Sequence, residues 1–142
     1  EIVDAASTLN EIEWFLPDAD VIVLACPLND ETRGLAGQSF FTNIKHGAIL
    51  INIARGALIE DEAMIDALNR GQLEAAVLDV FHTEPLPAKA PLWTHPKVRV
   101  TAHTSFAGDG TRSRWDELFF DNLPRFVQGK KLMYEVAPAD II

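Results

Sequence analysis

Residues 48–56 read Ala48-Ile49-Leu50-Ile51-Asn52-Ile53-Ala54-Arg55-Gly56, a short apolar run that ends in an arginine and a glycine. A continuous apolar run bounded by turn signals predicts a strand buried on both faces of a parallel sheet, here over residues 48–54. A guanidinium is too polar for the interior of such a strand, so Arg55 should mark its carboxyl end, and Gly56 lets the backbone turn. Ligands bind at the carboxyl ends of strands in open α/β sheets. Arg55 is therefore the first candidate functional residue.

The composition predicts one globular domain and argues against several classes of function. Hydrophobic residues make up 48% of the 142 residues, and the formal net charge is −9. This charge argues against nonspecific binding to nucleic acid or an anionic membrane, and we expect neither as a partner. The single cysteine, Cys26, cannot form an intrachain disulfide, and no paired Cys or His spacing predicts a metal site. With no apolar run near the roughly 20 residues of a membrane span and no visible signal peptide, we expect a cytoplasmic protein.

Strands and helices are predicted to alternate along the chain. The apolar runs predict four strands, over residues 21–25, 48–54, 75–80 and 98–102. Helical periodicity predicts helices over residues 8–16, 39–46 and 60–70, and a long one whose apolar face runs from 115 to 127. This βαβ alternation is typical of a Rossmann-like parallel sheet with right-handed crossovers. Because four strands make a thin sheet, we expect at least one unpaired edge unless a partner or a missing segment covers it.

Side chains that can bind ligands or transfer protons follow the predicted strands at their carboxyl ends. These are Cys26-Pro27, Arg55, Asp79 and His103, and Glu84 lies in the proline-rich loop just past the third strand. Parallel strands point the same way, so these positions should share one edge of the sheet. We therefore expect Arg55, Glu84 and His103 to converge.

Such a trio could act on a 2-oxo acid. The planar guanidinium of Arg55 can hold a carboxylate bidentately. The His103 imidazole can give or take a proton near neutral pH, and the Glu84 carboxylate can fix the tautomer of its ring. Each residue also has a structural alternative: an ordinary surface arginine, a solvated glutamate and a hydrogen-bonded structural histidine. For His82, the sequence does not distinguish between a surface and a functional role.

Four motifs, taken together, resemble the D-isomer-specific 2-hydroxyacid dehydrogenases. They are Cys26-Pro27-Leu28, Asn52-Ile53-Ala54-Arg55-Gly56, Leu78-Asp79-Val80-Phe81 with Glu84-Pro85, and Thr101-Ala102-His103. Their order and spacing fit, and the resemblance runs roughly from the first helix to Val136. It implies an oxidoreductase that transfers a hydride between NAD or NADP and a small 2-oxo or 2-hydroxy acid, and a homodimer.

The resemblance also implies residue roles. His103 would be the acid/base, Glu84 its partner, and Arg55 the ligand of the substrate carboxylate. Asp79 would lie beside the nicotinamide carboxamide. The implied cofactor-binding residues are Cys26, Pro27, Ile53, Ala54, Arg55, Asp79, His103 and Ser105.

The sequence departs from the family pattern at several points. No G-x-G-x-x-G phosphate loop is present, and the acidic residue that holds the ribose is missing with it. Ala102 stands where a proline is usual, and Phe106 is expected to narrow the pocket. We therefore expect residues 1–130 to be the C-terminal half of a dinucleotide-binding domain, and 131–142 a tail toward an absent substrate domain. Such a fragment should be inactive alone. A non-enzymatic nucleotide-sensing module and a dimerising fragment are the alternatives.

Overall fold

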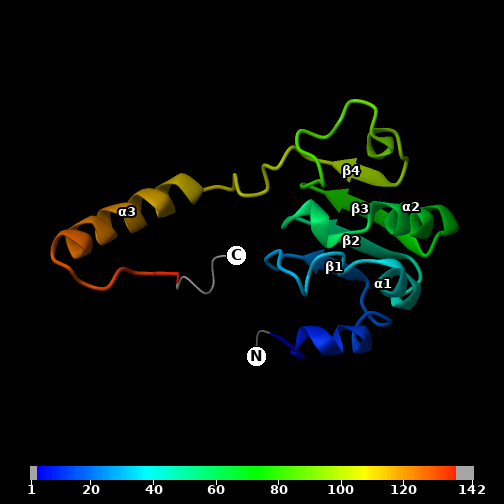
Figure 1. Ribbon diagram of the computed structural model, residues 1–142, viewed down its shortest axis with the longest axis horizontal. Coiled ribbons are helices and arrows are strands. Elements are labelled where there is room, and N and C mark those ends of the chain that lie inside the picture. The colour runs from blue at the N-terminus through cyan, green and yellow to red at the C-terminus, as the bar shows by residue number, and fades with distance from the viewer. Residues whose placement is uncertain (1–2, 137–142) are drawn as a thin grey trace. The chain divides into compact units, whose positions relative to one another are not determined.

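The computed structural model describes residues 3–136 of the chain. It divides into two compact units, Glu1–His103 and Thr104–Ile142, and each is described by itself. The first unit contains a four-stranded sheet in the order β1-β2-β3-β4, in which every strand is parallel to its neighbour (Figure 1). The strands are β1 Val21–Leu24, β2 Ala48–Asn52, β3 Leu73–Leu78 and β4 Val98–Val100. The predicted Rossmann-like parallel sheet is confirmed.

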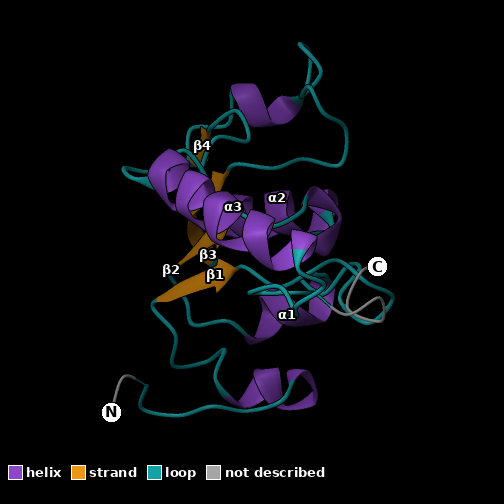
Figure 2. Cartoon of the chain, turned by 90° about the vertical axis from the view of Figure 1, so that its left-hand side faces the viewer, coloured by secondary structure: helices purple, strands orange, loops and turns teal. Residues whose placement is uncertain are grey.

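The helices of the first unit are short, and most of them lie between strands. They are η1 Leu9–Trp14, α1 Gln38–Asn43, η2 Gly56–Leu58, α2 Asp61–Arg70 and η3 Pro91–Trp93, where η marks a 3-10 helix (Figure 2). The α2 helix ends as predicted, because Gly71 adopts the left-handed conformation just after it, with φ +77°. The predicted helix over 8–16 is the 3-10 helix η1, where the Glu11 carboxylate accepts a hydrogen bond from the Thr8 backbone N–H at 3.2 Å.

Several predicted boundaries are wrong by a few residues. The helix predicted over 39–46 ends at Asn43, because Ile44 is extended and its side chain is buried in the core. The strand predicted over 48–54 ends at Asn52, whose side chain bonds to the backbone that follows. The third strand starts and ends two residues early, and the fourth ends at Val100.

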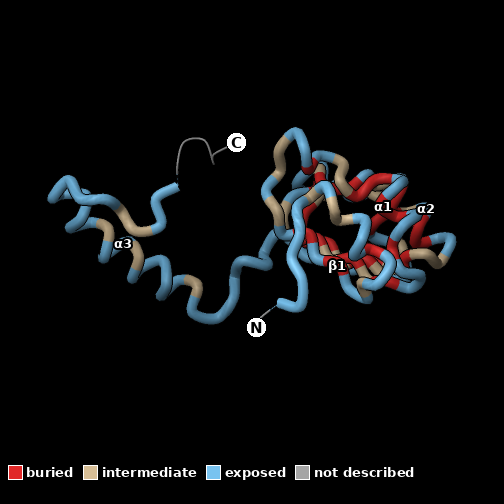
Figure 3. The backbone as a smooth tube through the Cα atoms, turned by 90° about the horizontal axis from the view of Figure 1, so that it is seen from below, coloured by how far each residue is buried: buried red, intermediate tan, exposed pale blue. Residues whose placement is uncertain are grey.

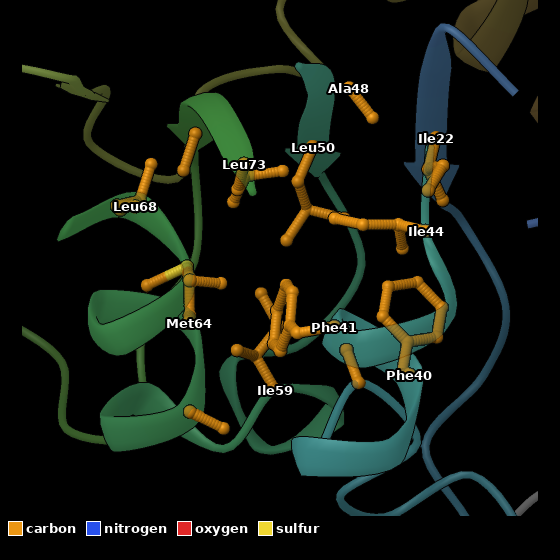
Figure 4. Packing of buried hydrophobic residues seen from close by; sticks show 14 of the residues in the cluster. Ile22, Phe40, Phe41, Ile44, Ala48, Leu50, Ile59, Met64, Leu68 and Leu73 are labelled. Carbon is orange, nitrogen blue, oxygen red and sulfur yellow. The ribbon is translucent and has the colours of Figure 1, made fainter. Parts of the chain in front are cut away.

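The core of the first unit lies between the sheet and the pair α1 and α2. Phe41 of α1 and Met64 of α2 pack toward Leu50 of β2 and Leu73 of β3, and all four side chains are fully buried (Figure 4). Burying each such side chain contributes about 1.5–3 kcal/mol to folding. This packing holds the strands in register and therefore fixes the positions of their carboxyl ends.

The opposite face of the sheet is less covered. The β1 side chains alternate, with Ile22 and Leu24 buried and Val21 and Val23 about half exposed. Within the described residues, β1 and β4 each pair with a single strand and form the two edges of the sheet.

The second unit consists mainly of α3, Thr111–Val127, with Pro124 inside the helix. None of the residues of α3 is buried, and Figure 3 shows this helix as exposed along most of its length. Its large exposed apolar side chains are Trp115, Phe119, Phe120, Leu123, Phe126 and Val127. Across residues 3–136, no helix is both long and apolar enough to cross a membrane, and no cluster of three or more His, Cys, Asp or Glu side chains could hold a metal.

Candidate active site

Asn52, the last residue of β2, shapes the turn that carries Arg55. Its side chain is fully buried, and its Nδ2 donates to the Arg55 carbonyl at 2.9 Å. Its Oδ1 accepts from the Ala54 backbone N–H at 3.1 Å. These two bonds end the strand and leave the Arg55 side chain exposed. This role of Asn52 was not predicted from sequence, although a lone amide inside an apolar run is a signal for it.

Gly56 brings this turn against the connection that follows β3. A Cβ at Gly56 would lie 2.0 Å from the Phe81 carbonyl carbon and 2.4 Å from the His82 backbone nitrogen. Only a residue without a side chain permits such an approach of two backbones. The residues around Arg55 and those that lead to Glu84 are therefore in direct contact.

Glu84 and His103 meet at the carboxyl edge of the sheet. The Nδ1 atom of His103 lies 2.6 Å from Oε2 of Glu84, and the other Glu84 oxygen accepts from the Phe81 backbone N–H at 2.9 Å. The His103 backbone N–H donates to the Asp79 carbonyl at 2.9 Å, which extends the β3–β4 pairing. His103 has φ +55°, a conformation that costs a non-glycine residue of the order of 1–3 kcal/mol and that clusters at functional sites.

The surroundings of Glu84 favour its charged form. The hydrogen bond from His103 holds the pKa of Glu84 below its usual value, assisted by the Phe81 N–H and the positive charge of Arg55. An ionised Glu84 can only accept hydrogen bonds, so His103 Nδ1 carries the hydrogen and donates it. The remaining ring nitrogen, Nε2, is then the atom that can exchange a proton with a substrate.

Arg55 contributes a positive charge at the same edge. Its Nη1 donates to the neighbouring Ala54 carbonyl at 2.7 Å, and no ion pair to a carboxylate is recorded for it among residues 3–136. Its charge nevertheless influences the Glu84 carboxyl. The structure thus brings Glu84 and His103 into contact, with Arg55 nearby.

The other predicted site residues have varied environments. Asp79 is buried, and its carboxylate accepts a hydrogen bond from the Thr101 hydroxyl. Cys26 is partly buried, and the carbonyl of Pro27 accepts a hydrogen bond from the Thr32 hydroxyl at 2.8 Å. Ile53 is exposed and Ala54 partly buried in the turn before Arg55, whereas Ser105 and Phe106 belong to the second unit.

Replacing Glu84 by Gln should make the chain less stable in a pH-dependent way. The lowered pKa of Glu84 contributes stability that is present above its ordinary value of 4.5 and is lost as the pH falls through the folded value. The wild type should therefore exceed E84Q in free energy of unfolding at neutral pH, by less than about 1 kcal/mol because the pair is exposed. Urea unfolding from neutral pH down to about pH 3 measures this. A difference that stays constant over the whole range would contradict it.

A known protein family matches most of the chain. The family model described as "D-isomer specific 2-hydroxyacid dehydrogenase, NAD binding domain" matches residues 1–105. The glyoxylate/hydroxypyruvate reductase B of Enterobacter sp. strain 638 is 40% identical over 119 residues, which cover 84% of this chain but 37% of that protein. The chain therefore spans well under half the length of this relative.

Solved structures are similar as well. A D-isomer-specific 2-hydroxyacid dehydrogenase from Xanthobacter autotrophicus Py2, in complex with NADPH and MES, superposes with a TM-score of 0.81 at 34% identity, over 92% of this chain and 53% of that one. An NADPH-dependent glyoxylate/hydroxypyruvate reductase from Sinorhizobium meliloti, in complex with NADP and sulfate, gives 0.81 at 27% identity, over 92% and 42%. The chain belongs to the D-isomer-specific 2-hydroxyacid dehydrogenase family and matches its NAD-binding domain.

Proposed function

We propose that this chain is part of an oxidoreductase that transfers a hydride between NAD(P)H and a small 2-oxo or 2-hydroxy acid. The observation that carries the proposal is the 2.6 Å contact between His103 and Glu84 at the sheet edge that also bears Arg55. The names of two similar proteins, both glyoxylate/hydroxypyruvate reductases, favour glyoxylate or hydroxypyruvate as the substrate. No observation favours the nucleotide-sensing alternative.

Arg55, His103 and Glu84 have different roles toward such a substrate. Arg55 binds the carboxylate through its guanidinium fork and so orients the neighbouring carbonyl. Protonated His103 donates a proton from Nε2 to the carbonyl oxygen during reduction, and neutral His103 accepts it from the hydroxyl during oxidation. Glu84 holds the ring by Nδ1 and stabilises its charged form.

The nicotinamide cofactor supplies the hydride when it is bound. The residues described here fit one end of it: Ile53, 43% exposed beside Arg55, offers an apolar surface for a flat ring at the carboxyl end of β2. Ala54, Cys26 and Pro27 complete the proposed contacts, with Asp79 as a polar member. Ser105, which the resemblance also implies, belongs to the second unit and is not placed at this edge. The 142 residues contain no G-x-G-x-x-G loop for the pyrophosphate.

The organisation of the whole protein is part of the proposal. Residues 1–130 would form the C-terminal half of a dinucleotide-binding domain, and 131–142 a tail toward a substrate domain, although 137–142 lie outside the described residues. We propose a cytoplasmic location and a homodimer. An edge strand offers a surface for association and supports the homodimer alone. Sedimentation of the whole protein as a monomer at high concentration would count against the dimer.

Turnover of the whole protein tests the proposed reaction. NADH and NADPH oxidation should be measured with glyoxylate, hydroxypyruvate and pyruvate, on the whole protein and on the 142-residue chain. We expect turnover by the whole protein and little or none by the chain alone. A folded whole protein that turns over none of these acids would refute the function, and rapid turnover by the 142-residue chain would refute the fragment hypothesis.

Arg55→Met in the whole protein should raise KM for the 2-oxo acid about 10- to 100-fold. A hydrogen bond to a charged group contributes roughly 1.5–3 kcal/mol, and methionine removes it while keeping an unbranched side chain. Steady-state kinetics measure the change. Arg70→Met is the matched control, because Arg70 lies in the last turn of α2 in an ion pair with Asp66. An R55M enzyme whose KM stays within about twofold of the wild type would exclude the assigned role.

A further inference from the structure

His82 is a titratable side chain that none of the roles above uses. It lies in the connection after β3, and its Nε2 is 2.7 Å from the carbonyl oxygen of Ile59. A carbonyl oxygen can only accept, so Nε2 carries the hydrogen and donates it. Ile59 is buried and comes just after η2, on the connection between β2 and α2. The imidazole of His82 therefore links the segment that carries Glu84 to the core.

The segment from Phe81 to Glu84 is short and is held mainly at its start. The Phe81 side chain is partly buried against the core, and the backbone at Phe81 and His82 touches Gly56. Glu84 lies two residues further on and folds back to accept the Phe81 N–H. A displacement of His82 would therefore move the Glu84 carboxylate directly.

We propose that His82 is a positioning residue, whose hydrogen bond to the Ile59 carbonyl keeps the segment 81–84 docked so that the Glu84 carboxylate stays in contact with His103. The catalytic consequence of this rests on the proposed function. The positional part depends only on contacts within the first unit, and it can be tested without turnover.

The carboxyl groups near His82 make it possible to distinguish the effect of its charge from the effect of its hydrogen bond. Asp61, the first residue of α2, has its Oδ1 3.8 Å from His82 Nε2. Burial raises the pKa of Asp61, and His82 partly offsets this. The pKa of Glu84 is lowered by the hydrogen bond from His103, by the Phe81 N–H and by the charge of Arg55. Any uncharged replacement of His82 removes the same charge, so a difference in the pKa of Glu84 between two such variants reports a change of position.

Two substitutions of His82 in the 142-residue chain remove its charge but differ in whether the new side chain can donate a hydrogen bond. In His82→Gln the carboxamide nitrogen can donate where Nε2 does, whereas His82→Leu keeps an apolar side chain without a donor. Carboxyl ¹³C NMR titration of the folded chains reports the pKa of Asp61 and of Glu84 separately. His46→Gln is the control, because His46 is an exposed histidine in the turn before β2.

The two carboxyl groups should respond differently. The pKa of Asp61 should rise in both His82 variants, since both remove the positive charge. The pKa of Glu84 should stay low in H82Q and rise toward its ordinary value in H82L. A Glu84 carboxyl that titrates in folded H82L as it does in the wild type would overturn the proposal. If H82L does not fold, His82→Asn, whose amide is one carbon shorter than that of Gln, takes its place with the same expectation.

Kinetics of the whole protein give the catalytic readout. H82L should lower kcat roughly 10- to 100-fold through misplacement of Glu84, and KM for the 2-oxo acid should stay within about twofold because Arg55 is untouched. H82Q should keep most of the wild-type kcat. Equal losses of kcat in H82Q and H82L would overturn the positioning role. A wild-type protein without any turnover would instead refute the proposed function, and the NMR titration would still decide the position of Glu84.

Discussion

Gly56→Ala is expected to cost the chain about 3 kcal/mol or more in free energy of unfolding. The new methyl group would lie 2.0 Å from the Phe81 carbonyl carbon and 2.3 Å from its oxygen. These are backbone atoms, so no side-chain rotation can relieve the clash, and the two connections must move apart. Their separation would also disturb the approach of Arg55 to Glu84. Urea unfolding followed by far-UV circular dichroism measures the loss.

Gly47→Ala is the matched control for this experiment. A Cβ at Gly47 meets nothing within 4 Å, and its φ of +82° alone makes alanine unfavourable, by about 1–2 kcal/mol. If G56A were no less stable than G47A, the close packing of the two connections would not be a requirement of the fold.

His103→Gln in the whole protein should lower kcat by about 10²- to 10⁴-fold, the usual contribution of general acid/base catalysis. Glutamine can still hydrogen-bond to its surroundings, but its amide cannot exchange a proton with the substrate near neutral pH. KM should change little, because Arg55 binds the carboxylate. Steady-state kinetics with the preferred 2-oxo acid measure the effect.

The exposed His46 provides the comparison, and His46→Gln should retain full activity. A loss of less than about 10-fold in a folded H103Q enzyme would mean that another group supplies the proton. Circular dichroism of the variant shows whether the fold is intact, which matters because His103 has a positive φ.

The sheet could be predicted from sequence because its strands are continuous apolar runs between turn residues. Their exact ends could not, since these depend on single side chains. Asn52 stops β2 by bonding to the backbone ahead of it, and Ile44 leaves α1 because its side chain enters the core.

In the candidate site too, some features could be predicted from sequence and others could not. The positions of Arg55 and His103 follow from the rule that parallel strands end at one edge. The convergence of Glu84 with His103 was also expected, but the 2.6 Å contact itself depends on how a proline-rich loop folds back, which periodicity does not report. The contacts of Gly56 and His82 join segments more than 20 residues apart, and neither residue type is specific for such a role.

The half-exposed valines of β1 have a consequence for the handling of this chain in solution. Val21 and Val23 place apolar surface in water on a molecule whose net charge of −9 keeps copies apart at low ionic strength. Added salt screens that repulsion, and sulfate, which is excluded from protein surfaces, also strengthens apolar burial. Ammonium sulfate should therefore precipitate the isolated chain readily, whereas dilute, low-salt buffers should keep it dispersed.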